Sequence, residues 1–533
     1  MKKIILPILL ILGTILPLEA GVFTTYVDPA LGWILPLEAG SYTIYVDPAL
    51  GLDREWCGSA AGPWACQTIQ YAFDNYAAEG STIQLAPGTY NENVVIDTRI
   101  TLEGAGSGDD PNVDSIITSA AASTNVIRLT TGGSSATDRM VIRNLRVTGG
   151  TGGPNMGNGI NISSGSYMTF ENVASVGNDG NGIAFNAGGD QTDFVVSSCY
   201  LSNNHGGTGF RVPTSASVDG LSITDSTMNG NGVIGMSMYG SVTDLYISDS
   251  VFNDNNLVGI YGTLHRYFAT KKSAVIDGVT TNGNGRGIAL RIYGGSLTIT
   301  NSTASDNNRA NADDEGQGLD LSVRDADTTI VLSSVTTQNN EDVNIFLETK
   351  SGGSLTSASF DDITATGSND EPTAPFCDGC GVWLHSLGTA SLSNVSITNS
   401  TIRGNNRGIV LEAETQPLTN VSLSGNIIQD NQASAGIDIS ADAAFGNQAN
   451  YNVIVGNGMG VDNNDTTYTF DATDNWWGDI SGPYHSGTNP AGLGDEVSDN
   501  VAYDPWITDF DDPLIFQDGF ESGNTSAWSS SVP

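Results

Sequence analysis

The sequence predicts an all-β fold, a parallel solenoid capped at its N-terminal end by a short helix. A four-residue phrase recurs along residues 159–462: glycine, an apolar residue, any residue and a second apolar residue. Each repeat also contains a second short run of alternating polar and apolar residues. Alternation with a period of two is typical of strands, and a fixed period of about 25 residues is typical of stacked repeats. The phrase begins at Gly159, Gly182, Gly209, Gly235, Gly259, Gly287, Gly318, Gly381, Gly408, Gly436 and Gly460.

One interval in this series is about twice as long as the others. It runs from Gly318 to Gly381, 381 − 318 = 63 residues, and Asn344-Ile-Phe-Leu is the intervening copy of the phrase. Asparagines also recur at matching turns, where their amides are expected to form a hydrogen-bonded ladder between coils. These asparagines are Asn204, Asn231, Asn255, Asn307, Asn405 and Asn431.

The phrases together resemble the right-handed parallel β-helix of the pectate-lyase type, over roughly residues 80 to 480. The resemblance implies a single-stranded right-handed parallel β-helix solenoid. Thr68 to Gly80 reads as an amphipathic helix directly before the first strands, and this resembles the helix that plugs the first coil of many secreted β-helices. A plug is needed because an open solenoid end would expose unpaired strand edges.

The start of the chain is typical of a secretory signal peptide, residues 1–20, with Met1-Lys-Lys before an apolar stretch. We expect an N-terminal segment with a near-repeat over 21–66, the β-helix over 67–480 and an acidic loop-like tail over 481–533. The near-repeat, in which Ile34 to Gly51 copies Ile15 to Gly32, is assigned no function.

Charge narrows the choice of partners. The chain has 19 Lys plus Arg against 59 Asp plus Glu, a net charge of −40. This excludes nucleic acid and anionic membranes as bulk partners. No later segment is apolar enough to span a bilayer. We expect a secreted or surface-exposed bacterial protein that acts as a monomer.

The cysteines agree with export. Cys57 and Cys66 lie close together, as do Cys377 and Cys380, and two local disulfides are expected. The alternative is a zinc site that joins both pairs across some 300 residues of sequence.

Two columns of residues are predicted to point outward, because the apolar positions of the phrase point inward. Over four consecutive coils these columns collect scarce cations beside carboxylates and aromatic rings. Aromatic faces stack on sugars, and cations pair with uronate carboxylates. The alternative interpretation is a salt-bridged, solvated face. The candidate catalytic residues are Lys350, Arg324 and Arg291, and the candidate substrate-binding residues are Tyr261, Tyr293, Phe346, Glu348, Trp383 and His385.

The segment Asn311-Ala-Asp-Asp-Glu-Gly-Gln-Gly-Leu-Asp320 resembles the Asp-Asp-Gly-φ-Asp segment of polysaccharide lyase family nine. The resemblance implies that Asp313, Asp314 and Asp320 hold Ca²⁺ and that Lys350 is the base. The sequence departs from the pattern, because Glu315 to Gln317 add three residues inside it and the preceding coil supplies no aspartate.

Two functions follow. The first is an exported β-helix that binds, and as a pectate-lyase-like enzyme cleaves, an acidic polysaccharide. The second is a non-catalytic adhesive solenoid that presents a rigid flank. A hydrolase ranks below a lyase, because the aspartate pairs of β-helix polygalacturonases have no counterpart here. The cationic segment His265 to Lys272 is read either as a catch for acidic glycans or as a solvated loop.

Overall fold

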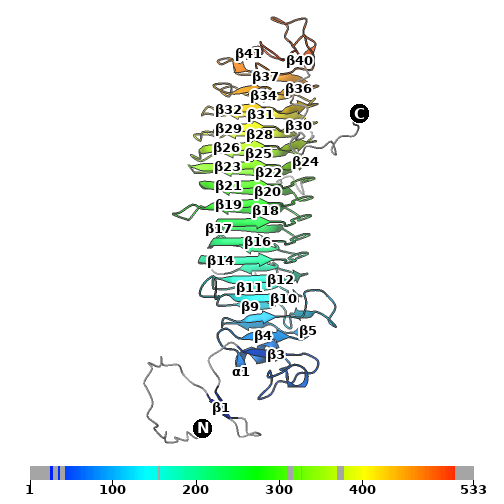
Figure 1. Cartoon of the computed structure of the whole chain (residues 1–533), viewed down its shortest axis with the longest axis vertical. Helices are drawn as coiled ribbons and strands as arrows, with labels where there is room; N and C mark the ends of the chain where they lie inside the picture. The colour runs from blue at the N-terminus through cyan, green and yellow to red at the C-terminus, as the bar shows by residue number, and fades with distance from the viewer. Residues whose placement is uncertain are drawn as a thin grey trace, which may run out of the picture.

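Strands on successive turns of the chain pair in parallel, so that the backbone winds into a right-handed parallel β-helix (Figure 1). The computed structural model describes residues 42–153, 156–186, 188–308, 316–325, 327–368, 377 and 379–509, with the backbone of 25–27 and 34–36. The apolar positions of the glycine-led phrase point into one continuous core, where Ile260 and Ile288 are at most 1% exposed. The predicted fold class is confirmed.

The first sheet is built from the glycine-led phrases and positions the site. Its strands pair in register from coil to coil, and the copy at Asn344 fills the long interval as predicted. The strands are β6 (Val94–Ile96), β9 (Ile127–Leu129), β11 (Ile160–Ile162), β13 (Ile183–Phe185), β15 (Phe210–Val212), the first part of β17 (Ile234–Ser248), β18 (Val258–Leu264), β20 (Arg286–Ile292), β22 (Gln317–Val323), β25 (Val343–Thr349), β28 (Cys380–Ser386), β31 (Arg407–Ala413), β34 (Ala435–Ile439) and β37 (Met459–Asn463).

The second sheet extends past both predicted ends of the solenoid. Its first strand precedes residue 67 and its last follows residue 480, because both still pair in parallel with the neighbouring coil. The strands are β3 (Thr43–Val46), β4 (Thr82–Leu85), β7 (Thr101–Glu103), β10 (Met140–Thr148), β12 (Met168–Val176), β14 (Gly189–Ser197), β16 (Ala216–Thr224), the second part of β17, β19 (Ser273–Asp277), β21 (Gly295–Thr300), β23 (Thr328–Ser333), β26 (Leu355–Asp361), β29 (Ser393–Thr398), β32 (Thr419–Ser424), β35 (Gln448–Asn450), β38 (Phe470–Asp471) and β41 (Val501–Ala502).

The third wall of the coils is made of short strands and bridges. Five strands form a separate parallel sheet, and isolated bridges continue this wall through the earlier coils. Near the N-terminus, β5 pairs with β8, and β8 pairs with the end of β10. The strands are β5 (Gly88–Asn91), β8 (Ser115–Thr118), β24 (Thr336–Gln338), β27 (Thr364–Thr366), β30 (Thr401–Arg403), β33 (Ile427–Gln429) and β36 (Val453–Val455).

One of the turns between the walls places a residue at positive φ on successive coils. Asp225 has φ 50°, Asp249 has φ 48°, Asn301 has φ 50° and Asp362 has φ 54°. Only glycine, asparagine and aspartate adopt this region readily. Part of the large negative charge is therefore explained by turn geometry.

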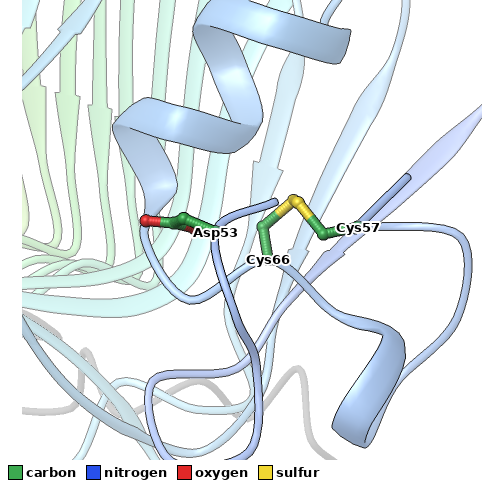
Figure 2. A group of neighbouring side chains, drawn as sticks. All are labelled: Asp53, Cys57 and Cys66. Carbon is green, nitrogen blue, oxygen red and sulfur yellow. A yellow bond between two sulfur atoms is a disulfide. The ribbon is translucent and has the colours of Figure 1, made fainter. Parts of the chain in front are cut away.

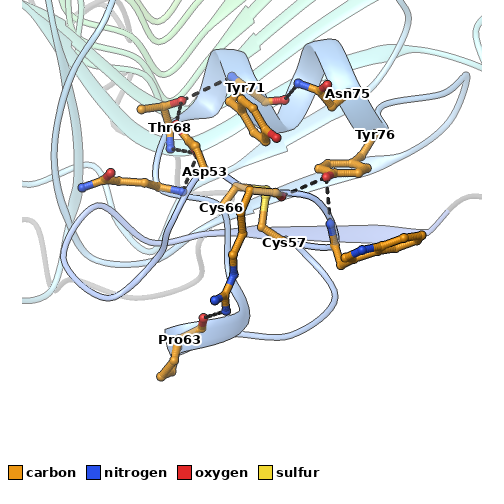
Figure 3. The surroundings of a disulfide bond; sticks show 11 residues. Asp53, Cys57, Pro63, Cys66, Thr68, Tyr71, Asn75 and Tyr76 are labelled. Atoms are coloured by element: carbon orange, nitrogen blue, oxygen red, sulfur yellow. Dashed lines mark hydrogen bonds between the residues drawn. A yellow bond between two sulfur atoms is a disulfide. The ribbon is translucent and has the colours of Figure 1, made fainter. Parts of the chain in front are cut away.

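A disulfide and a helix close the N-terminal end. Cys57 and Cys66 form the predicted bond (Figure 2), after which α1 (Ile69–Tyr76) buries Phe73 against the first coils. The predicted N-cap Thr68 accepts a hydrogen bond from the Tyr71 backbone N–H at 3.3 Å. Asp53 in turn accepts from the backbone N–H of Thr68 at 3.0 Å, which ties the helix start to the disulfide loop (Figure 3). The predicted capping helix is confirmed, and it ends at Tyr76, before the predicted closing residue Gly80.

At the other end, Trp477 is fully buried and packs on the last coils, so this tryptophan acts as a lid. The remaining elements are η1 (Gly62–Trp64), β39 (Pro483–Tyr484), β40 (Gly494–Glu496), β1 (Thr25–Val27) and β2 (Ile34–Pro36). The predicted signal peptide lies outside the described residues. Within the part of the chain that is described, no helix is long and apolar enough to cross a membrane.

Candidate functional site

The predicted outward columns form on the first sheet. Asp320 lies beside Phe346, which lies beside Trp383 on the next coil. In the second column, Arg291, Ser322, Glu348, His385 and Glu412 are also consecutive register partners. The predicted neighbours are therefore confirmed over β20, β22, β25, β28 and β31. One position differs from the prediction. A register shift in β17 pairs Ser241, not Tyr239, with Thr263.

These columns line a cleft of about 510 Å³, at whose N-terminal end Arg291 is exposed. Glu348 is 5% exposed and His385 is 8% exposed. Strand alternation predicts the direction of a side chain, whereas its depth depends on what the neighbouring coils place around it. The lining residues are Tyr261, Arg286, Ala289, Leu290, Arg291, Asp320, Ser322, Arg324, Phe346, Glu348, Lys350, Trp383, His385, Leu387, Glu412 and Glu414.

Three rings form a stack at the C-terminal half of the cleft. The ring centroids of Phe346 and Trp383 are 4.4 Å apart, and those of Trp383 and His385 are 5.1 Å apart. Phe346 and Trp383 also pack with Cys380, which forms the second predicted disulfide with Cys377. The two aromatic rings therefore cover each other's faces and act as a wall. With both cysteine pairs bonded, the zinc alternative is wrong.

Glu348 is the centre of the polar part of the cleft. Its carboxylate forms an ion pair with the Lys350 ammonium and accepts a hydrogen bond from the Ser322 hydroxyl at 3.2 Å. The nearer ring nitrogen of His385 lies 4.0 Å from Glu348. Neither ring nitrogen of His385 has a hydrogen-bond partner, although the side chain is only 10% exposed. A buried polar group without a partner is costly, and here it borders an open cavity.

The two predicted arginines lie at the N-terminal half of the cleft. The Arg291 guanidinium sits 5.4 Å from the ring centroid of Tyr261, a cation–π contact. Arg324 has a buried Nε without a hydrogen-bond partner. Tyr293 is not among the lining residues and lies under Arg266, at 5.4 Å.

The predicted calcium ligands are only partly described. Asp313 and Asp314 lie outside the described residues. Asp320 forms an ion pair with Arg286 of the preceding coil at 3.4 Å. One group in the described part of the chain, Asp53 with the two cysteines of Figure 2, brings possible metal ligands together, and its sulfurs are bonded to each other.

Both lysines of the cationic segment after β18 are paired with carboxylates. Lys271 pairs with Asp325 at 2.6 Å, and Lys272 pairs with Asp219 at 2.6 Å. His265 is fully buried beside Thr243, whose hydroxyl lies 2.9 Å from the ring. Burial, and next the charge of Lys271, lower the pKa of His265 to about 4.

Sequence reasoning did not select three charged residues of the cleft. Arg286 precedes the glycine of its phrase, at a position that Gln317, Val343, Cys380 and Arg407 occupy on the following coils. The residues at this position form a third outward column, and this column is the sequence signal from which Arg286 could have been predicted. Glu412 and Glu414 continue the predicted columns onto β31 and the residue that follows it, and they also line the cleft.

Comparisons with known proteins find similar chains among solved structures. No protein-family model matches the sequence, and no curated protein matches it. Among solved structures, the chain is similar to the A-module of the Azotobacter vinelandii mannuronan C-5 epimerase AlgE4, with 17% identity over 76% of this chain and 95% of that chain and a TM-score of 0.38. It is also similar to the Dettilon tailspike protein, with 13% identity over 78% of this chain and 68% of that chain and a TM-score of 0.33. For the GH87 α-1,3-glucanase of Streptomyces thermodiastaticus strain HF3-3, identity is 15% over 88% of this chain and 70% of that chain, with a TM-score of 0.31.

Proposed function

We propose that this chain is an exported protein that binds an acidic polysaccharide along the cleft from β20 to β31. The observation that carries the proposal is the state of Arg291 and Arg324. Neither guanidinium forms an ion pair with any described carboxylate, although acidic residues outnumber basic ones by 59 to 19. Guanidinium groups bind carboxylates in a bidentate manner, and a buried donor such as the Arg324 Nε costs about 1–3 kcal/mol while unsatisfied.

The length of the cleft favours a polymer over a small molecule. Its lining residues come from the five strands β20 to β31 and, with Tyr261, from β18 on the coil before them, and the five steps of about 4.8 Å span about 24 Å. The Tyr261 ring lies beside the cationic end, and the Ser322 hydroxyl lines the floor. Groups of this kind contact the rings and hydroxyls of successive sugars.

The test is calorimetric titration with acidic polysaccharides, both those charged on every sugar and those charged on alternate sugars, and with a neutral glucan. We expect at least one acidic polymer to bind and the neutral glucan not to bind. Arg291→Gln and Arg324→Gln should each weaken binding about tenfold, since a charge-assisted hydrogen bond contributes about 1.5–3 kcal/mol. Arg403→Gln on β30, where Arg403 pairs with Asp430, is the matched control. Equal losses in all three variants, or no binding, contradict the proposal.

A second candidate function is β-elimination at the same cleft, favoured by the unpartnered imidazole of His385. A base removes the proton from the carbon next to the uronate carboxylate, a C=C bond forms to the neighbouring ring carbon as the glycosidic C–O bond of that carbon breaks, and the leaving oxygen takes a proton. Lys350 is the base by resemblance to lyases. His385 is the other candidate, because the Lys350 ammonium is already engaged by Glu348.

Release of unsaturated uronides, followed by absorbance with calcium and with a chelator, tests the lyase activity and its predicted need for Ca²⁺. If product forms, Lys350→Met or His385→Gln should abolish it without unfolding the chain. If no product forms from any bound polymer, the chain is a binding solenoid, the adhesive alternative. Export itself is tested by recovering the chain outside the cytoplasm with Cys57 and Cys66 oxidised.

A further inference from the structure

The cleft separates its charges along the solenoid axis. At the N-terminal end, Arg291 on β20 and Arg324 just after β22 have no carboxylate partner among the described residues. At the C-terminal end, Glu412 on β31 and Glu414 beside it have no described cation within 4.0 Å. The Glu412 carboxylate accepts a hydrogen bond from the Trp383 indole N–H at 2.9 Å, a neutral partner.

The charges between these ends balance. Asp320 is paired with Arg286, and Glu348 is paired with Lys350. Among the described residues of the cleft, the charged groups without an opposite partner are therefore two positive groups at one end and two negative groups at the other. Three to four coils of about 4.8 Å separate them, about 14–19 Å.

The negative end continues beyond the cleft. Asp438 and Asp462 follow Val410 in register on the next two coils, and Asp438 is paired with Arg407 at 3.4 Å. The pKa of Asp438 is raised, first by burial; Arg407 lowers it, whereas Asp462 and Glu412 raise it further. Carboxylates already repel each other here, so a further anion would be unfavourable.

We infer that the site takes an acidic polysaccharide in which charged sugars are separated by uncharged ones, and that it discriminates against a polymer of uronates alone. The inference rests on the proposed function. If every sugar carries a carboxylate, one lies beside Glu412 and Glu414 whenever another is held by the arginines, and like charges in contact are costly. An uncharged sugar instead offers hydroxyl donors to these two carboxylates. The discrimination is thus a repulsive element built into one end of the cleft.

The test compares two tetrasaccharides of equal length by calorimetry, with the corresponding polymers in parallel. One alternates glucuronate and N-acetylglucosamine, and the other is tetragalacturonate. We expect the alternating oligosaccharide to bind at least tenfold more tightly, although it carries half the charge. In the double variant Glu412→Gln with Glu414→Gln, tetragalacturonate should bind about tenfold more tightly than to the wild type, so that the ratio of the two dissociation constants falls towards one.

The control is Glu171→Gln on β12, which removes the same charge from an exposed position outside the cleft. Thermal unfolding of each variant verifies that it is folded. Tighter binding of tetragalacturonate to the wild type, or an equal gain for both ligands in the double variant, overturns the inference and leaves the proposed function intact. Absence of binding by every acidic ligand overturns both.

Discussion

Two sides of the same coils use polar side chains in opposite ways. At one turn asparagine recurs, except on one coil, where Ser368 takes the turn and Asn344 of β25 supplies the amide. Each asparagine donates its Nδ2 to the Oδ1 of the next, at 2.7 to 3.3 Å. In the cleft, register partners differ from coil to coil, as in Asp320, Phe346, Trp383 and Val410. The ladder runs through Asn178, Asn204, Asn231, Asn255, Asn284, Asn307, Asn340, Asn344, Asn405, Asn431 and Asn457.

The difference separates residues that stabilise the fold from those that are proposed to contact a ligand. A buried amide in the ladder forms hydrogen bonds with the amides of the neighbouring coils, so replacing it lowers the free energy of unfolding. In the cleft, by contrast, the ring nitrogens of His385 form no hydrogen bond in the described part of the chain. Under the proposed function, the polysaccharide would be the partner of such side chains in the cleft.

Breaking the ladder should give the largest effect on stability. Asn255→Ala removes the acceptor of the Asn231 side-chain and backbone N–H groups, and it leaves Asn284 Oδ1 without that donor. Unsatisfied buried groups cost about 1–3 kcal/mol each, so the free energy of unfolding should fall by about 3 kcal/mol. Urea denaturation measures it. The control Asn464→Ala, at an exposed site, should change it by less than about 0.5 kcal/mol.

The second prediction concerns His265, a buried polar residue outside both the ladder and the cleft. Its pKa in the fold is about 4, below the ordinary value of 6.5. As the pH falls through 6.5 the unfolded chain takes up the proton first, so stability is full above pH 6.5 and is lost towards pH 4. Between pH 7 and pH 5, protonation of this residue in the unfolded chain should lower the free energy of unfolding by about 2 kcal/mol. His265→Gln should lack this part of the pH dependence. If the free energy of unfolding depends on pH in the same way in the wild type and in His265→Gln, the role of His265 in the pH dependence is contradicted.

The smallest expected effect on stability is at His385. His385→Phe retains a ring against Trp383 and removes two polar atoms without partners. The free energy of unfolding should stay the same or rise by about 0.5–1 kcal/mol, while affinity for the acidic polysaccharide falls. Denaturation and calorimetry on the same preparation measure both. A large loss of stability would show that His385 belongs with the structural residues.

Sequence predicted most of the coil and less of the cleft. The period of the repeat predicted that Phe346 and Trp383 are register partners, because each coil contributes one strand to the first sheet and that strand pairs with the next copy of the phrase. It did not predict that these two rings would stack on each other and lose their exposed faces. It also omitted Asn284 and Asn340 from the ladder, since uneven turn lengths hide their equivalence. The direction of a side chain follows from strand alternation, whereas its burial and its partners depend on residues of other coils that are distant in sequence.

The most direct test of the account is hydroxyl-radical footprinting of the folded chain with and without a bound acidic polysaccharide. Tyr261 lines the cleft, and Tyr246 is 43% exposed on the second sheet. The account predicts that oxidation of Tyr261 falls when the polymer is bound while oxidation of Tyr246 is unchanged. Protection of Tyr246 with no change at Tyr261 would contradict it.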